Sequence, residues 1–234
     1  MRFDRKTVMV TGAAGNLGHA VTRAFADRGA RLVLVDVDRS RLEGAFGGDA
    51  EDRLLAPADL LDPQQVAAAV RGATARFGGI DVLCHLAGGF RMGEAVHETS
   101  DSTWDFLQDL NARTLLAVAR AVVPVMVAAG GGRIVTVGAA AAQKGVARMG
   151  AYCAAKAGVI RLTEAMSAEL RGRGINVNCV LPSIIDTPEN RAAMPQAEPS
   201  NWVAPAALAD VVAFLASDAA RAIHGAALPV SGLS

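Results

Sequence analysis

The sequence lacks an excess of charge of either sign, because 23 lysines and arginines balance 23 aspartates and glutamates. Without such an excess there is no long-range field to gather nucleic acid. No stretch of eighteen residues is free of both charges and helix breakers, so no membrane span is expected. The amino terminus runs directly into an apolar strand with no signal-peptide apolar region before it, which indicates a soluble cytoplasmic protein.

Cysteine and histidine are scarce as well. Cys84, Cys153 and Cys179 lie far apart and form no CxxC pair, and the four histidines are scattered. The apolar surroundings of the cysteines favour buried, reduced thiols over disulfides. Neither residue type supplies a ligand cluster, so we expect no metal site.

Short, β-branched apolar runs alternate with longer helical patterns along the chain. The runs lie at 7–12, 31–36, 53–59, 81–88, 133–138, 175–182 and 226–232. The helical patterns lie near 16–28, 39–46, 63–77, 102–129, 151–172 and 205–217. Apolar strands separated by helices indicate a parallel sheet covered on both faces, and right-handed crossovers favour a doubly wound α/β fold. No repeat or linker interrupts the pattern, so we expect a single domain over residues 1–234.

One segment breaks this alternation. Residues 183–202 contain three prolines and are too long for an ordinary connection. Loops of this length are usually lids or binding loops, so we expect a substrate lid here.

A strand, a glycine-punctuated turn and a helix open the chain, in VMVTGAAGNLGHAV (8–21). Gly12 permits a tight turn, Gly15 lets the backbone approach a pyrophosphate, and Gly18 allows the helix to pack on the strand. The unpaired N–H groups at the helix start suit phosphate. The pattern predicts a dinucleotide site.

Residues at the ends of the following runs fit the same ligand. Asp36 ends the second run, where a carboxylate accepts hydrogen bonds from an adenosine ribose and repels a 2′-phosphate. NAD(H) is therefore preferred, and NADP(H) is not excluded because Arg39 and Arg41 lie close by. Asp59, at the end of the third run, fits either the adenine edge or the cap of the following helix. The small residues of LAGG (86–89) suit a flat cofactor.

Tyr152 and Lys156 share one face of an alanine-rich stretch that is expected to be helical. Free tyrosine, with a pKa of about 10, exchanges protons poorly at neutral pH. A cation one helical turn away favours the phenolate, and hydride transfer to a polarised C=O or C=N bond needs such a donor. Because Tyr152 is the only tyrosine in the chain, its place beside a lysine indicates proton exchange coupled to hydride transfer.

Together these motifs make the chain similar, over essentially its whole length, to the short-chain dehydrogenases/reductases. The features that carry the resemblance are the TGxxGxxG turn, Asp36, the Ala87-Gly88 pair, Asn111, Tyr152-x-x-x-Lys156 and the closing IHGAALPVSG. The resemblance implies a single-domain Rossmann fold with a seven-stranded parallel sheet in the order 3-2-1-4-5-6-7. It also implies that the tyrosine exchanges a proton with the substrate, the lysine holds the nicotinamide ribose and lowers the tyrosine pKa, and the asparagine orders a water.

The resemblance also implies the residues that contact the cofactor. They are Gly12, Gly15, Asn16, Leu17, Gly18, Asp36, Asp59, Leu60, Ala87, Gly88, Lys156, Pro182, Ile185 and Thr187. Asn111 is a mediocre helix former, so a packed or water-bridging role is favoured over an exposed one. His85, at a strand end, fits a ribose contact or a satisfied structural histidine, and we favour the latter.

The serine that such enzymes usually carry thirteen residues before the tyrosine is Ala139 in this chain. Alanine cannot donate a hydrogen bond, and losing one oriented donor commonly costs about a hundredfold or more in rate. Either the enzyme is weak, or its substrate does not need that donor.

A second, narrower resemblance concerns quinonoid dihydropteridine reductases, which use NADH and keep the tyrosine and lysine without the serine. The GxxGxxG spacing, the small residues replacing the serine and LPSIIDTPENRAAMPQAEPSNW (181–202) carry it. It implies that Thr187 lies at the cofactor and that Arg191, Met194 and Trp202 belong to the lid. Phe90 fits either stacking on a flat ring or packing within its loop.

The main hypothesis is an NAD(H)-dependent oxidoreductase acting on a small carbonyl, alcohol or imine, with a quinonoid dihydropterin as the narrower alternative. A catalytically weak dinucleotide-binding sensor or partner subunit is the alternative of another class, and the retained Tyr152 and Lys156 argue against it. The helices near 102–129 and 151–172 are too apolar for free surfaces, so we expect a homodimer or homotetramer through them.

Overall fold

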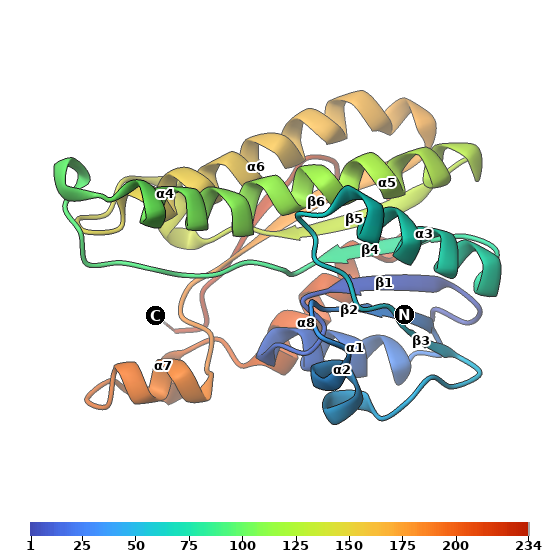
Figure 1. Cartoon of the computed structure of the whole chain (residues 1–234), viewed down its shortest axis with the longest axis horizontal. Coiled ribbons are helices and arrows are strands. Elements are labelled where there is room, and N and C mark those ends of the chain that lie inside the picture. Colours follow the sequence, from blue (N-terminus) through green and yellow to red (C-terminus); the bar gives the residue numbers. More distant parts are fainter. Residues whose placement is uncertain (234) are drawn as a thin grey trace.

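The computed structural model describes residues 1–233 and contains a seven-stranded sheet (Figure 1). Its order, β3-β2-β1-β4-β5-β6-β7, and its parallel pairings confirm the predicted doubly wound fold. The strands are β1 (Thr7–Thr11), β2 (Arg31–Val35), β3 (Arg53–Leu55), β4 (Val82–His85), β5 (Gly132–Val137), β6 (Ile175–Pro182) and β7 (Ala227–Val230). The order reverses between β1 and β4, which is where doubly wound sheets bind ligands.

Helices cover both faces of the sheet (Figure 1). On one face lie α1 (Asn16–Ala26), α2 (Arg39–Phe46) and α8 (Pro205–Leu215). On the other lie α3 (Pro63–Phe77), α5 (Thr114–Ala128) and α6 (Gly150–Leu170). The remaining α-helices are α4 (Asp101–Gln108), which leads into α5, and the short α7 (Pro188–Ala193).

Strand β1 shows why the sheet is buried on both sides. Val8 and Val10 point into the apolar cluster formed with α1 and α8, while Met9 points into the cluster formed with α3 and α5. Side chains alternate across a strand, so a continuous apolar run fills both clusters. Fully burying each such side chain contributes about 1.5–3 kcal/mol. The three cysteines are free and buried, as predicted.

Strands β3 and β4 end three or more residues earlier than the sequence pattern predicts. Strand β3 ends at Leu55 rather than at residue 59, and β4 ends at His85 rather than at residue 88. Beyond β3, the N–H groups of Ala56 and Ala58 still bond to carbonyls in and directly after β2. The chain therefore continues alongside its neighbour while it leaves the sheet and enters the ligand-facing edge.

The expected helix over 102–129 is interrupted. A π-helical turn, Asp109–Arg113, separates α4 from α5. Single π turns within helices often occur at functional sites, and this one carries Asn111. The whole run Asp101–Ala128 meets the length and apolarity expected of a membrane span. Core helices of soluble proteins meet the same test, and Val122 and Met126 of this run are buried against the sheet.

The segment 183–202, expected to be a lid, contains regular structure. It holds α7 and a 3-10 turn at Pro199–Asn201. In Figure 1, α7 stands at the lower left, opposite the α4 end of the upper helices. The connection from β4 to α4 runs between them.

Candidate active site

The glycine turn after β1 is a close-packed backbone crossing. Gly12 has a φ of 66°, and a Cβ there would lie 3.0 Å from the backbone of Ala87. A Cβ on Gly18 would lie 2.2 Å from the carbonyl oxygen of Gly12. No side chain caps the start of α1 at Gly15, so its first N–H groups remain open to an anion.

A cavity of about 520 Å³ lies at the carboxyl ends of β1, β2 and β4. The predicted cofactor residues that line it are Gly12, Gly15, Asn16, Leu17, Gly18, Asp36, Asp59, Leu60, Ala87 and Gly88. Further lining residues are Val37, Arg41, Ala58, Leu61, Leu86, Leu110 and Thr114. Except for Arg41 and for Leu86 of the LAGG segment, these residues carry no sequence signal that distinguishes them from any other loop or helix residue. The predicted Lys156, Pro182, Ile185 and Thr187 lie outside this lining.

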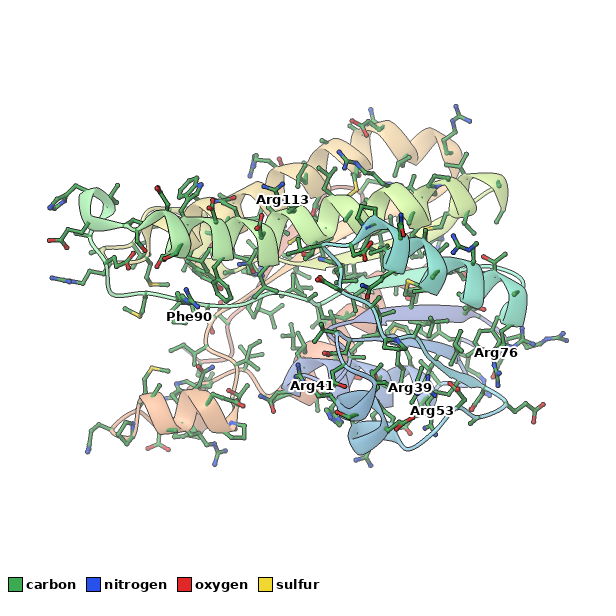
Figure 2. All side chains as sticks on the ribbon, in the orientation of Figure 1. Arg39, Arg41, Arg53, Arg76, Phe90 and Arg113 are labelled. Atoms are coloured by element: carbon green, nitrogen blue, oxygen red, sulfur yellow. The ribbon has the colours of Figure 1, made fainter. Side chains whose placement is uncertain are left out.

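Asp36 is buried at the end of β2 and is held from two sides. Its carboxylate accepts hydrogen bonds from the N–H of Ala14 at 3.1 Å and of Val37 at 2.9 Å. Arg41 lies 3.2 Å away as an ion-pair partner, whereas Arg39 pairs with Glu43 and Asp49. Figure 2 shows both arginines at α2. One cation therefore accompanies the Asp36 carboxylate at the cavity wall.

Asp59 does not end a strand, and the capping role considered for it is wrong. Asp62 caps α3 by accepting from the N–H groups of Gln64 and Gln65. The carboxylate of Asp59 closes a local turn by accepting from Leu61 N–H at 2.9 Å. Asp59 therefore lies at the cavity as a turn residue, because β3 ends earlier than its apolar run.

Lys156 and Asn111 converge on Gly88. A Cβ on Gly88 would lie 2.9 Å from Lys156 Nζ and 2.8 Å from Asn111 Oδ1. Nζ donates to the carbonyl of Val137 at 2.9 Å. Asn111 is buried, not exposed, and its amide exchanges two 3.1 Å bonds with the backbone of Gly89. The far end of the cofactor cavity is thus bordered by a buried cation and a buried amide.

Tyr152 lies half-buried on α6, beside two predicted substrate residues. Its ring meets the edge of Phe90 at 4.8 Å between centroids, and it packs against the apolar cluster that contains Ala139. Figure 2 shows Phe90 on the connection from β4 to α4. Phe90 therefore contacts the tyrosine rather than packing only within its own loop, and Ala139 places a methyl group in the same cluster.

The pKa values of the pair differ from the predicted direction. Burial, with a smaller effect of Cys153, raises the pKa of Tyr152 to about 12. Burial also lowers the pKa of Lys156 to about 8, against a smaller opposing effect of Cys179. The expected lowering of the tyrosine pKa by the lysine is not seen in the unliganded protein, because burial favours the neutral phenol.

His85 is a satisfied structural histidine, as favoured from the sequence. Its Nδ1 lies 3.0 Å from Thr11 Oγ1, and its Nε2 lies 3.4 Å from Thr114 Oγ1. Burial, with a smaller contribution from the charge of Lys156, lowers its pKa to about 3, so the ring is neutral. The two threonines, which the sequence did not single out, tie β1 and β4 to the end of the π turn.

The residues expected to form a lid make their contacts within their own segment. Thr187 caps α7 by accepting from the N–H of Asn190, and Arg191 forms a bidentate ion pair with Asp186 at 2.6 and 2.7 Å. Trp202 is buried. Met194 ends α7. The one bond from α7 to the glycine turn, within residues 1–233, joins Glu189 to Asn16.

Comparisons with known proteins agree with this geometry. A family model described as Enoyl-(Acyl carrier protein) reductase matches residues 12–232. D-threitol dehydrogenase of Mycolicibacterium smegmatis is 35% identical over 243 residues, covering 99% of this chain and 93% of that protein. Cis-4-hydroxycyclohexanecarboxylate dehydrogenase of Sinomonas cyclohexanicum is 36% identical over 98% of this chain and 96% of that protein. The crystal structure of levodione reductase is similar with a TM-score of 0.90 and 30% identity, covering 99% of this chain and 98% of that one.

These relatives are dehydrogenases and reductases that match nearly the whole chain. Nicotinamide cofactors are typical of their family, which fits the glycine turn and the cavity behind it. The chain therefore belongs to the short-chain dehydrogenase/reductase family and is an oxidoreductase acting on alcohols or carbonyls.

Proposed function

We propose that this protein is an NAD(H)-dependent oxidoreductase that interconverts a small secondary alcohol and its carbonyl compound, with Tyr152 as the group that gives and takes the proton. The observation that carries the proposal is the convergence of Lys156 Nζ and Asn111 Oδ1 on Gly88, at the end of the dinucleotide cavity. Tyr152 lies one helical turn from that lysine.

The cavity fits a dinucleotide because glycines line it, so that a ligand can approach the backbone directly. The first N–H groups of α1, which no side chain caps, would meet the pyrophosphate, and Gly12 and Gly18 would let the backbone approach it. Asp36 would accept hydrogen bonds from the adenosine ribose, and its negative charge supports NAD(H) over NADP(H). Because Arg41 partly offsets that charge, the preference should be moderate rather than absolute.

A bound nicotinamide supplies or accepts the hydride. With its raised pKa, Tyr152 stays protonated at neutral pH and can donate its hydroxyl proton to the oxygen of a carbonyl that gains a hydride. Lys156, one helical turn away, would place a positive charge near this group, and its own ammonium group is fixed by the bond to the Val137 carbonyl. Asn111 fixes the backbone after β4 on which the reacting ring would lie.

Ala139 leaves the substrate oxygen with one donor fewer than the usual serine would give. The substrate should therefore be a carbonyl compound activated by its own structure or turned over slowly. A quinonoid dihydropterin, whose conjugated ring needs less help, remains the narrower alternative. Imines are a further class of acceptor, and the assay described next includes them.

The test follows the loss of NADH absorbance at about 340 nm with cyclic ketones, quinones, imines and quinonoid dihydropterin in parallel. We expect turnover of at least one acceptor, and a loss of about 100-fold or more in Tyr152→Phe with NADH binding retained. Circular dichroism checks that the variant is folded. NADH binding without turnover of any acceptor would instead support a dinucleotide-binding sensor.

We also propose that the protein is cytoplasmic and forms a homodimer or homotetramer through α5 and α6. Leu116 on α5 and several alanines on α6 are exposed to solvent. Such apolar side chains are expected at a contact between subunits. Light scattering after size exclusion should give a dimer or tetramer mass. A monomer that persists at micromolar concentration would refute the assembly and leave the activity proposal intact.

A further inference from the structure

A second, smaller cavity borders Tyr152 on the side of the β4–α4 connection. It measures about 130 Å³, and its lining includes Arg91, Glu94, Leu107, Arg148 and Tyr152. A cavity of about 150 Å³ accommodates a benzene molecule, so this one admits a small substituent rather than a long chain. A group bound here would lie beside the proposed proton donor.

Arg91 lines this cavity and has unused hydrogen-bond donors. Its guanidinium lies over the ring of Phe106 on α4, with Cζ 3.8 Å from the ring centroid. Within residues 1–233 no ion pair or hydrogen bond engages it. Stacking fixes the plane of the guanidinium without using its N–H groups. Arg91 is thus held in place while its N–H groups remain free to bind a ligand.

Arg148 adds a second cation to the same cavity. Its backbone has a φ of 59°, a left-handed conformation that residues other than glycine rarely adopt. Its Nη1 donates to the carbonyl of Gly93 at 2.8 Å, and Gly93 N–H donates to the carbonyl of Arg148 at 2.9 Å. The first bond holds the Arg148 side chain, and the second its backbone, against the loop that carries Arg91.

The carboxylate in the cavity lining does not pair with either arginine. Glu94 accepts from the N–H and hydroxyl of Ser100 at 3.2 and 3.4 Å and from the hydroxyl of Thr103 at 3.1 Å. It is therefore held by neutral donors at the start of α4. Two guanidinium groups and one carboxylate leave the cavity with a net positive charge beside Tyr152.

We propose that Arg91, assisted by Arg148, binds a carboxylate on the substrate, so that the substrates are small hydroxy acids and oxo acids. A planar guanidinium with free N–H groups matches a carboxylate in a bidentate manner. The size of the cavity favours a free acid over a long acyl chain. This inference rests on the proposed function, because it assigns the reacting carbon to the neighbourhood of Tyr152.

The kinetic test compares 4-oxocyclohexanecarboxylate with its uncharged amide, using NADH as reductant. Wild type should prefer the acid by about tenfold or more in kcat/KM, with the difference mainly in KM. Arg91→Gln should remove that preference, and Arg91→Lys should retain part of it because the charge remains. Arg71→Gln, at an exposed position on α3, is the matched control and should keep the preference.

A binding test separates failure of this inference from failure of the proposed function. Cyclohexanecarboxylate and its amide, neither of which can be reduced at a ketone, are titrated into the NADH complex by calorimetry. The acid should bind at least about tenfold more tightly in wild type and no more tightly than the amide in Arg91→Gln. Equal binding of acid and amide by wild type overturns the carboxylate site, whatever the turnover.

Discussion

Replacing Lys156 with methionine should stabilise the unliganded protein while removing its activity. Lys156 is 6% exposed, and burial lowers its pKa from about 10.5 to about 8. A change of this size corresponds to a penalty of roughly 3 kcal/mol on the charged form at neutral pH. The hydrogen bond to Val137 O offsets about 1 kcal/mol of it. Methionine has no charge to bury, so the expected gain is about 2 kcal/mol.

The gain should depend on pH in a defined direction. Because the pKa of Lys156 is lower in the folded than in the unfolded chain, the unfolded chain binds more protons between pH 8 and 10.5. The stability of the wild type therefore rises through that window relative to Lys156→Met. The advantage of the variant should be complete below pH 8 and should vanish near pH 10.5.

Thermal and urea unfolding without cofactor measure this effect at about pH 7 and pH 10, at one fixed protein concentration. For a chain of this length, 2 kcal/mol corresponds to a rise of about 4–8 °C in Tm. Lys144→Met, at an exposed position, is the control and should change Tm little. A destabilised Lys156→Met at neutral pH, or a difference that does not change with pH, would refute the reasoning.

Three further substitutions test other parts of the site. Gly18→Ala places a Cβ 2.2 Å from the carbonyl oxygen of Gly12, so it should lower the unfolding free energy by about 2 kcal/mol or more and weaken NADH binding in a fluorescence titration. Asp36→Ala removes a carboxylate and leaves Arg41 without its partner. The ratio of NADPH affinity to NADH affinity should therefore rise at least about tenfold. An unchanged ratio would exclude Asp36 as the group that distinguishes the two cofactors. Ala139→Ser adds a donor, so kcat on simple ketones should rise about tenfold or more if the alanine limits the rate, and should not rise if the site suits a conjugated ring.

The parallel sheet and the glycine turn were predictable because they follow from local patterns, whereas the order of the strands was implied by the resemblance to a known family. Apolar runs separated by helices indicate a doubly wound sheet, and Gly12 and Gly18 mark a backbone crossing that leaves no room for a side chain. The end of β3 was not predictable in the same way. The apolar run continues past Leu55, where the ladder ends although the N–H groups of Ala56 and Ala58 still bond to the neighbouring segment.

The parts of the site that the sequence missed depend on contacts between distant segments. The π turn at Asn111 is held by the backbone of Gly89, and a window of sequence around either residue does not contain the other. The pKa directions of Tyr152 and Lys156 follow from burial, which spacing along a helix does not reveal. The stacking of Arg91 on a ring of α4 is equally long-range.

The central claim is that a hydride moves between a nicotinamide and a substrate beside Tyr152. The most direct measurement supplies NADH deuterated at the transferring carbon together with a ketone that is turned over, and weighs the product alcohol by mass spectrometry. We predict one deuterium on the alcohol carbon with the wild type and almost no labelled product with Tyr152→Phe. Product that forms without deuterium, or forms equally well in the variant, would contradict the account.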